Sequence, residues 1–422
     1  MNLDERARRA AAAVDPVRVA ALARGLVRAR SVFEPERGST EAEAAAFVAE
    51  ALRDAGFGPV VEEAAPGRPN VICDWSGSAF DPASHRTLMF EGHTDVVTEG
   101  DPARWKIPPF EGRIEGGVLH GRGSADMKAG VAATIAALEA VRLVAPDLPG
   151  RIRLGFVADE EGMMLGIKHF IERGWADEVT GAIVCEPEEN EICLFQKGAM
   201  RMHVRVRGVM SHGAMPYAGV NPILAVSDVI AGVREIERAE QERLGEHPFL
   251  GRCWLTPTIV AAPPEGEAQH NVVPEAAYLA LDIRTVPGQD HDTLMERITA
   301  LCRSVEQATD RLEIEVERFE SRPWTETPAD DPLVAAIETA YPEVLARPPR
   351  YGGVPGATDG TFLRAWRNVP IVTLGPGDRT IPHRVDEFVR MADVVSAARL
   401  YAAAAVEYLG RDASIHPASA DG

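Results

Sequence analysis

The sequence predicts an α/β protein with a mainly parallel sheet, helices on both faces of that sheet, and an inserted α+β sandwich. Three apolar segments, residues 87–90, 151–158 and 181–185, are each followed by a polar break, and helical spacing recurs between them. Alternation of this kind is typical of a parallel sheet flanked by helices. Residues 200–206 instead alternate apolar and polar side chains, the period of a half-solvated strand. At 422 residues the chain is too long for one ordinary core, so we expect two domains.

The change of pattern near residue 194 gives the expected boundaries. The larger domain should occupy residues 1–194 and 309–411, the inserted domain residues 195–308, and a disordered tail residues 412–422. Within the larger domain, Thr40 with Glu43 three positions later is the signature of a capping box at the start of a helix. Further helices are expected over residues 16–30, 166–173, 221–240, 291–305, 332–341 and 387–409.

Composition excludes several classes of partner. The formal net charge of −20 argues against nucleic acid and anionic membranes, although a few arginines can still make a pocket for a small anion. No apolar run approaches the roughly 18 residues of a membrane span, and the N-terminus lacks the order of a signal peptide. The five cysteines form no C-x-x-C pair, which favours reduced thiols in a cytoplasmic protein.

A histidine and an acid follow the first apolar segment. His93 and Asp95 are two positions apart, so on an extended strand both side chains project to the same face. An imidazole beside a carboxylate is typical of a metal ligand with the partner that fixes its ring orientation. Taken alone, the pair could equally form a hydrogen bond inside a core.

More acids lie where the other predicted strands end, the edge at which α/β sheets collect their sites. Candidate ligands in or near these loops are His93, Asp126, Glu160, Glu161, Glu186 and His383. Such a mixed nitrogen and oxygen set suits zinc, cobalt or manganese. It has too many acids for one four-coordinate zinc, which favours two metals with a shared hydroxide as nucleophile. Of the adjacent Glu160 and Glu161, one would bind metal while the other accepts the proton of water. The alternative is that strand ends are acidic because they face solvent.

Four motifs in this order resemble a known family. They are His93-Thr94-Asp95-Val96-Val97, Gly121 to Gly130 with Asp126-Met127-Lys128, Asp159-Glu160-Glu161-Gly162 and Glu186-Pro187. The chain resembles the dinuclear metallohydrolases that include acetylornithine deacetylase, succinyl-diaminopimelate desuccinylase, aminoacylases and glutamate carboxypeptidases. The resemblance implies one metal on His93, Asp126 and Glu186, and a second on Asp126, Glu161 and His383. It also implies that Asp126 bridges, that Glu160 is the general base, and that Asp95 orients His93.

The inserted domain carries further matches to that family. The segment Ser211 to Pro216 resembles its lid and dimerisation motif, which implies a homodimer in which His212 reaches the partner's active site and stabilises an oxyanion. The resemblance makes Asn271, Arg284, Gly356 and Thr358 substrate contacts, and arginine is a natural bidentate partner for a carboxylate. Without the resemblance, these would be a loop histidine, a solvated arginine and a connecting loop.

Departures from the family pattern bear on the substrate. Glu186, where the aminopeptidases tend to have aspartate, favours deacylases and carboxypeptidases. The segment Gln196 to Met200 lacks the arginines that the desuccinylases use, which disfavours desuccinylation. Met163-Met164 replace small residues, and their bulk either reshapes the pocket or fills a gap in the core. We therefore expect a cytoplasmic homodimer that uses two zinc, cobalt or manganese ions to cleave the amide bond of an N-acyl amino acid or similar small carboxylate. The alternatives are hydrolysis of a non-peptide C–N bond, such as deamination of an aromatic amino acid, and a non-catalytic metal-binding protein.

Overall fold

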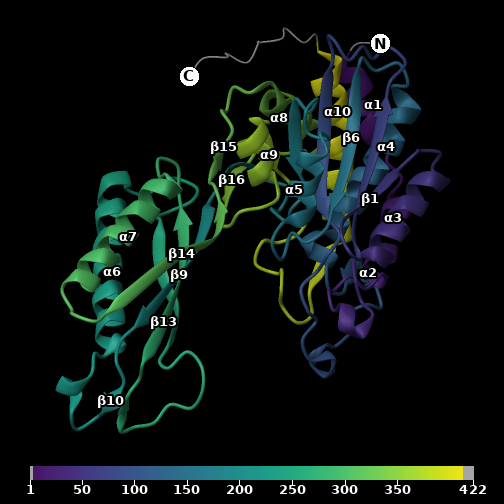
Figure 1. Ribbon diagram of the computed structural model, residues 1–422. Helices are drawn as coiled ribbons and strands as arrows, with labels where there is room; N and C mark the ends of the chain where they lie inside the picture. The colour runs from purple at the N-terminus through teal and green to yellow at the C-terminus, as the bar shows by residue number, and fades with distance from the viewer. Residues whose placement is uncertain (1–2, 412–422) are drawn as a thin grey trace. The chain divides into compact units, whose positions relative to one another are not determined.

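The computed structural model describes residues 3–411 and divides into two compact units (Figure 1). Within the described range, the first unit comprises the residues up to 194, residues 327–353 and those from 358 onwards. The second unit comprises residues 195–326 and 354–357. The expected disordered tail, residues 412–422, lies outside the described residues.

The first unit is built on a mixed, mainly parallel sheet in the order β1-β2-β6-β3-β7-β17-β8. The pairs β3–β6, β3–β7 and β7–β17 are parallel, whereas β1 and β2 are antiparallel to their neighbours. The strands are β1 (Val60–Ala65), β2 (Arg68–Ser76), β3 (Arg86–His93), β6 (Gly150–Val157), β7 (Gly181–Val184), β8 (Ile192–Gln196), β16 (Tyr351–Val354) and β17 (Ile371–Thr373). The predicted fold class is confirmed for this unit.

Helices cover both faces of this sheet, which explains why its central strands are buried along most of their length. On β3, Met89 packs into a cluster with Ile167 and Phe362, whereas the ring of the next residue, Phe90, lies 5.3 Å from that of Tyr401. The helices of the unit are α1 (Leu3–Ala13), α2 (Pro16–Arg28), α3 (Ala42–Asp54), α4 (Ala129–Val144), α5 (Leu165–Glu172), α8 (Pro332–Leu345), α9 (Gly360–Arg367) and α10 (Met391–Gly410). Helix α1 was not predicted; it buries Ala7, Ala10 and Ala11 and packs mainly on α10.

A second, small sheet of β4 (Arg113–Glu115), β5 (Val118–His120) and β18 (Phe388–Arg390) lies in the same unit. The first two strands form an antiparallel hairpin. We expected a helix from residue 387, but Phe388 and Arg390 pair with His120 and Val118, so the helix begins only at Met391.

The second unit has the predicted α+β architecture, with an antiparallel sheet in the order β11-β13-β9-β14. Its elements are β9 (Gly198–Arg207), β10 (Ser211–His212), α6 (Pro222–Leu244), β11 (Trp254–Ala261), β12 (Val272–Val273), β13 (Ala276–Thr285), α7 (His291–Gln307), β14 (Glu313–Arg322) and β15 (Thr325–Glu326). One face of the sheet packs on α6 and α7, with Val204, Val229 and Ile298 in a common core. The unit extends past the expected end at residue 308, because β14 pairs with β9. Among residues 3–411, no helix combines the length and apolar character that a membrane crossing requires.

Candidate metal centre

The candidate ligands of the first unit come from the ends of neighbouring strands. His93 is the last residue of β3, Glu160 and Glu161 follow β6, and Glu186 follows β7. These strands are adjacent and parallel, so their carboxyl ends lie at the same edge of the sheet. Asp126 lies in the turn before α4, and His383 lies in the segment between β17 and β18.

Asp126 lies between the two histidines. Its Oδ1 is 3.0 Å from Nε2 of His93, and its Oδ2 is 3.3 Å from Nε2 of His383. Each carboxylate oxygen therefore faces a different imidazole, which is the arrangement that a bridging carboxylate needs.

Each of the two histidines also lies close to a second carboxylate. Oε1 of Glu186 lies 3.6 Å from Nε2 of His93, and Oε1 of Glu161 lies 2.9 Å from Nε2 of His383. Ligands about 2.0–2.1 Å from a tetrahedral zinc are about 3.3 Å apart, so the spacing in both sets fits a cation of this kind. Ligand atoms of His93, Asp126 and Glu161 lie within 4.8 Å of one another, as do those of His93, Glu160 and Glu186. Glu160 is thus close enough to be a ligand as well as a base.

The electrostatics of the cluster also favour cations. Burial raises the pKa of Glu160 and of Glu186 well above the usual range for a carboxyl group. Burial also opposes the charged form of Asp126, but hydrogen bonds from the His383 and His93 rings outweigh it and lower the pKa of this carboxyl. Hydrogen bonds first to Asp126 and then to Glu161 raise the pKa of His383 to about 10. Protons on the rings thus neutralise buried carboxylates, and bound metal ions would replace those protons.

Asp95 connects His93 to the turn that carries the two glutamates. Its carboxylate accepts hydrogen bonds from the backbone N–H groups of Glu160 and Glu161, with N to O distances of 3.2 and 3.1 Å. Nδ1 of His93 lies 3.0 Å from the carbonyl oxygen of Asp95 and 3.5 Å from its Oδ1. Asp95 is therefore placed to orient both His93 and the Glu160–Glu161 turn.

Two of the expected substrate and oxyanion residues lie side by side in the second unit. His212 is in β10, which pairs with β12 so that His212 faces Val272. The next N–H, that of Gly213, donates to the carbonyl oxygen of Asn271 at 2.7 Å. Nδ1 of His212 accepts from the N–H of Ala214 at 3.0 Å, so the neutral ring carries its proton on Nε2.

The remaining expected substrate contacts divide between the units. Arg284 is in β13, and its Nε lies 2.6 Å from Oδ1 of Asp282. A Cβ added to Gly356 would lie 4.0 Å from Nη1 of Arg284, so these two residues are neighbours in the second unit. Thr358 belongs to the first unit, where its hydroxyl accepts from the N–H of Gly360 ahead of α9.

Two buried acids of the site, Glu91 and Glu387, were not singled out from the sequence. Burial raises the pKa of Glu91 to about 8, and its two-residue spacing from His93 was the signal that could have found it. Glu387 contacts the turn that holds Asp126, and nothing in its local sequence marks it.

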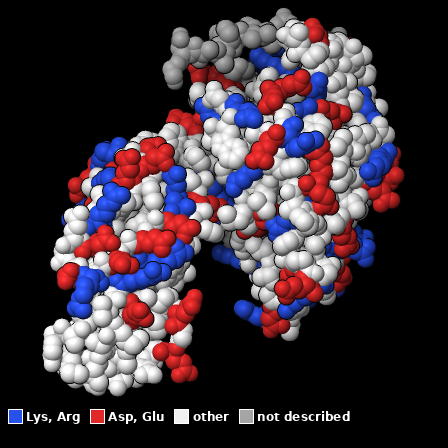
Figure 2. Space-filling view, in the orientation of Figure 1, with Lys and Arg blue, Asp and Glu red and all other residues white. Residues whose placement is uncertain are grey.

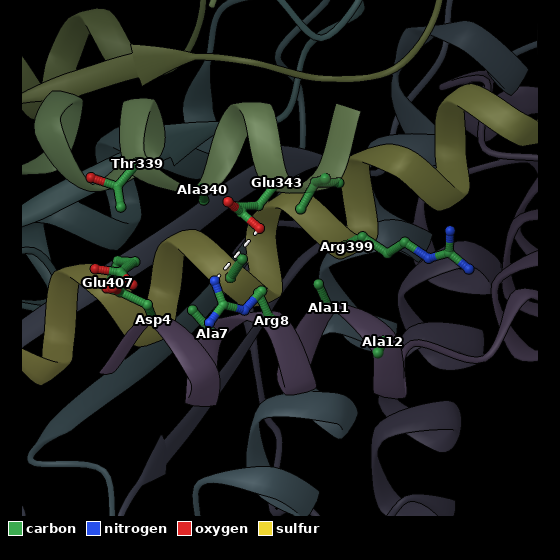
Figure 3. A pocket seen from close by; sticks show the side chains of 12 residues that line it. Asp4, Ala7, Arg8, Ala11, Ala12, Thr339, Ala340, Glu343, Arg399 and Glu407 are labelled. Atoms are coloured by element: carbon green, nitrogen blue, oxygen red, sulfur yellow. Dashed lines mark ion pairs between the residues drawn. The ribbon is translucent and has the colours of Figure 1, made fainter. Parts of the chain in front are cut away.

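A cavity of about 480 Å³ lies elsewhere in the first unit, between α1, α8 and α10 (Figure 3). Arg8 and Glu343 form an ion pair at 3.7 Å across it, and small alanine side chains line much of the rest. Because no candidate ligand lines this cavity, we assign it no part in the reaction proposed below.

Comparisons with known proteins agree with the motifs and with this geometry. The model of the Peptidase family M20/M25/M40 matches residues 89–407. The chain is 31% identical over 391 residues to a succinyl-diaminopimelate desuccinylase of Halorhodospira halophila, covering 90% of this chain and 95% of that protein. It is 30% identical over 393 residues to the protein of the same name from Alkalilimnicola ehrlichii, covering 90% and 96%.

Solved structures share the fold. An M20-family metallo-carboxypeptidase from Sulfolobus solfataricus superposes with a TM-score of 0.74 at 18% identity, covering 92% of this chain and 98% of that one. The aminopeptidase PepT of Bacillus cereus gives a TM-score of 0.73 at 20% identity, covering 94% and 99%. Because the family model spans most of the sequence and relatives at 30% identity or more cover nine-tenths of it, the chain belongs to the Peptidase family M20/M25/M40 and is an enzyme of this family of dinuclear metallohydrolases.

Proposed function

We propose that this enzyme hydrolyses the amide bond of an N-acylated amino acid or a similar small carboxylate, and that it uses two divalent ions to do so. Zinc is the first choice and cobalt or manganese the alternatives, because the ligands are imidazoles and carboxylates. The observation that carries the proposal is Asp126, whose two oxygens each face a different histidine at 3.0 and 3.3 Å. His93 and Glu186 would complete one set, and His383 and Glu161 the other.

Glu160 would move the proton in this reaction. Two bound divalent ions polarise a substrate carbonyl and lower the pKa of water. Glu160 would take the proton from the attacking water and deliver it to the nitrogen of the departing amine. Its buried position supports this role, because burial raises the pKa of the carboxyl and so makes it a better proton acceptor. The contact of Glu161 with His383 supports the opposite role, that of ligand, for Glu161.

His212 would stabilise the oxyanion of a substrate bound in the partner subunit of a homodimer. The proton on Nε2 makes this side of the ring a hydrogen-bond donor, as the role requires. The second unit also exposes large apolar side chains within residues 210–224, the segment that contains β10: Met210 is 58% exposed, Tyr217 82% and Leu224 64%. Figure 2 shows a largely uncharged surface over this end of the unit. Such a surface supports dimerisation through the second unit.

Arg284 would bind the substrate carboxylate, with Asn271, Gly356 and Thr358 as further contacts. The hydrogen bond from Arg284 to Asp282 fixes the orientation of the planar guanidinium. Because this group has five N–H donors, others remain for a substrate carboxylate.

The names of the relatives bear on which acyl group the enzyme removes from its substrate. Their shared name, succinyl-diaminopimelate desuccinylase, weighs against our expectation that desuccinylation is disfavoured. That expectation used the segment 196–200, in which the one cation, Lys197, is 6% exposed and donates to the carbonyl oxygen of Arg252 at 2.6 Å. We therefore place N-succinyl beside N-acetyl and N-aroyl amino acids as candidate substrates. A cytoplasmic location stays a prediction.

The test is product analysis with metal-reconstituted protein. The chelator-stripped chain, loaded with zinc, cobalt or manganese, would be incubated with N-succinyl, N-acetyl and N-aroyl amino acids, dipeptides and aminobenzoates. We expect a metal-dependent free amino acid together with its carboxylic acid, and a Glu160→Gln sample as the inactive control. Ammonia released from an aromatic amine would overturn the choice of bond. Metal binding without turnover on any member of the panel would overturn the proposed substrate class.

A further inference from the structure

We propose that Glu387 and Arg122 form a buried clamp that positions two metal ligands, Asp126 and His383, and thereby sets the affinity of the second ligand set. That set is Asp126, Glu161 and His383. The inference deepens the proposed function and rests on it. Glu387 and Arg122 are positioning residues, since their contacts are with the backbone of the ligand-bearing segments.

The carboxylate of Glu387 holds the turn that carries Asp126. Its Oε1 accepts the N–H groups of Ala125 at 2.9 Å and of Asp126 itself at 3.2 Å. Its Oε2 accepts the N–H of Gly123 at 3.1 Å and also receives Nη1 of Arg122. Glu387 is 1% exposed, so these charge-assisted hydrogen bonds form away from water. One side chain therefore fixes three backbone amides of the turn.

The guanidinium of Arg122 extends the same contact to the other ligand segment. Its Nη2 donates to the carbonyl oxygens of Thr98 at 3.2 Å and of His383 at 3.4 Å. Arg122 is 3% exposed, and its guanidinium lies 5.2 Å from the ring centroid of Trp105. A planar group held on several sides cannot move without moving its partners.

His383 lies in the segment between β17 and β18, outside the helices and strands of the unit. Its side chain is 52% exposed, and its backbone has a φ of 64°, in the left-handed region that non-glycine residues rarely adopt. The nearest regular structure is β18, which begins at Phe388. The carbonyl oxygen of Glu387 extends the β5–β18 ladder by accepting the N–H of Gly121 at 3.0 Å. Glu387 thus attaches the His383 segment to the Asp126 turn through both its backbone and its side chain.

The two ligand sets depend on this clamp to different degrees. The second set takes Asp126 and His383 from the clamped segments, and only Glu161 is held separately, by Asp95. The first set takes only Asp126 from them, since His93 is the last residue of β3 and Glu186 follows β7 in the central sheet. Loosening the clamp should therefore weaken the second metal more than the first. Residues that orient metal ligands typically change metal affinity by about 10–100-fold when mutated.

Glu387→Gln tests the clamp directly. Glutamine has the same length, but its amide group replaces one acceptor oxygen with a donor that faces Arg122 and Gly123, or Ala125 and Asp126. Cobalt(II) would be titrated into chelator-stripped protein in the absence of substrate, with the cobalt absorption spectrum and competition against a chelator as readouts. His383→Ala, which removes a ligand of the second set, identifies the binding step that belongs to that set. We expect Glu387→Gln to lower the affinity of this step by about 10–100-fold and to change its cobalt spectrum, with a smaller change in the other step.

Glu240→Gln is the matched control. Glu240 is 4% exposed and accepts hydrogen bonds from Arg243 and Arg297 in the second unit, so its substitution also removes a buried, paired carboxylate. This variant should titrate like the wild type. If Glu387→Gln does not fold, Arg122→Lys replaces it in the test. Lysine keeps the positive charge but lacks the planar guanidinium that contacts Glu387 and His383 at the same time.

The outcomes separate the inference from the proposed function. A wild-type cobalt titration and spectrum for Glu387→Gln, or for Arg122→Lys where that variant replaces it, would overturn the clamp while leaving the two-metal site in place. An equal loss in Glu240→Gln would show a general effect of destabilisation and would also overturn it. If the wild-type chain binds neither cobalt nor zinc, the proposed function fails, and the clamp fails with it.

Discussion

Glu160→Gln should abolish turnover while leaving the metal content of the enzyme unchanged. Glutamine is isosteric with glutamate but cannot accept the proton of water, and general-base catalysis contributes about 10²–10⁴-fold to a rate. At 1.36 kcal/mol for each factor of ten, the transition state would lose about 3–5 kcal/mol of stabilisation.

The structure indicates which features this substitution preserves. Asp95 holds residue 160 through its backbone N–H at 3.2 Å, so the turn does not depend on the side chain that is changed. The contacts of Asp126 with both histidines and of Glu161 with His383 involve other atoms. The assay is kcat on the best substrate of the panel, with metal counted by mass spectrometry on the same sample.

Two results would refute this reasoning. A wild-type rate for Glu160→Gln would remove Glu160 as the base. Loss of metal together with activity would show that Glu160 is a ligand, a real alternative because its carboxylate lies within 4.8 Å of ligand atoms of His93 and Glu186. Glu161→Gln is the matched control, and we expect it to lose metal because Glu161 faces His383 at 2.9 Å.

Three further predictions follow from individual contacts. Asp95→Asn replaces one of the two oxygens that hold the Glu160–Glu161 turn, so kcat should fall by about 10–100-fold while the circular dichroism spectrum is retained; an unchanged kcat would contradict this. His212→Ala should lower kcat by about 10²–10³-fold, the usual effect of removing an oxyanion donor. The Tm should not fall, because the His212 ring is exposed, and a wild-type rate would exclude the oxyanion role. Hydrogen bonds raise the pKa of His383 from its ordinary value of 6.5 to about 10, so the protonated ring stabilises the metal-free fold. This stabilisation is fully present below about pH 6.5 and is lost as the pH rises through 10. Metal must displace that proton, so metal affinity should rise with pH over this range, with proton uptake by the buffer measurable by calorimetry; an affinity that does not change with pH would refute the coupling.

The sheet that carries the site could be predicted because its signal is local. Strands such as β3 are buried on both faces, so their apolar runs stand out from the sequence, and the polar residues that follow them mark the carboxyl edge. His93, Glu160, Glu161 and Glu186 could therefore be placed near one another from strand order alone. Asp126 and His383 were candidates because they lie in loops near predicted strand ends, and the resemblance to the family added which ligands would share each metal.

The clamp could not be predicted, because its contacts are distant along the chain. Glu387 and Gly123 are 264 positions apart, and the sequence around Glu387 has the composition of a helix start. Pairing of Phe388 with His120 overrides that local preference. Helix α1 was missed for a related reason, since alanines such as Ala7 and Ala10 gain their burial from packing in the folded unit.

The most direct test of a two-metal amide hydrolase is the rate of hydrolysis as a function of bound metal. Zinc would be added stepwise to the chelator-stripped chain, with an N-acyl amino acid from the panel as substrate. We expect free amino acid and carboxylic acid in equal amounts, at a rate that rises until two ions are bound to each chain. Two bound ions with no amide cleavage, or full activity in the stripped chain, would contradict the account.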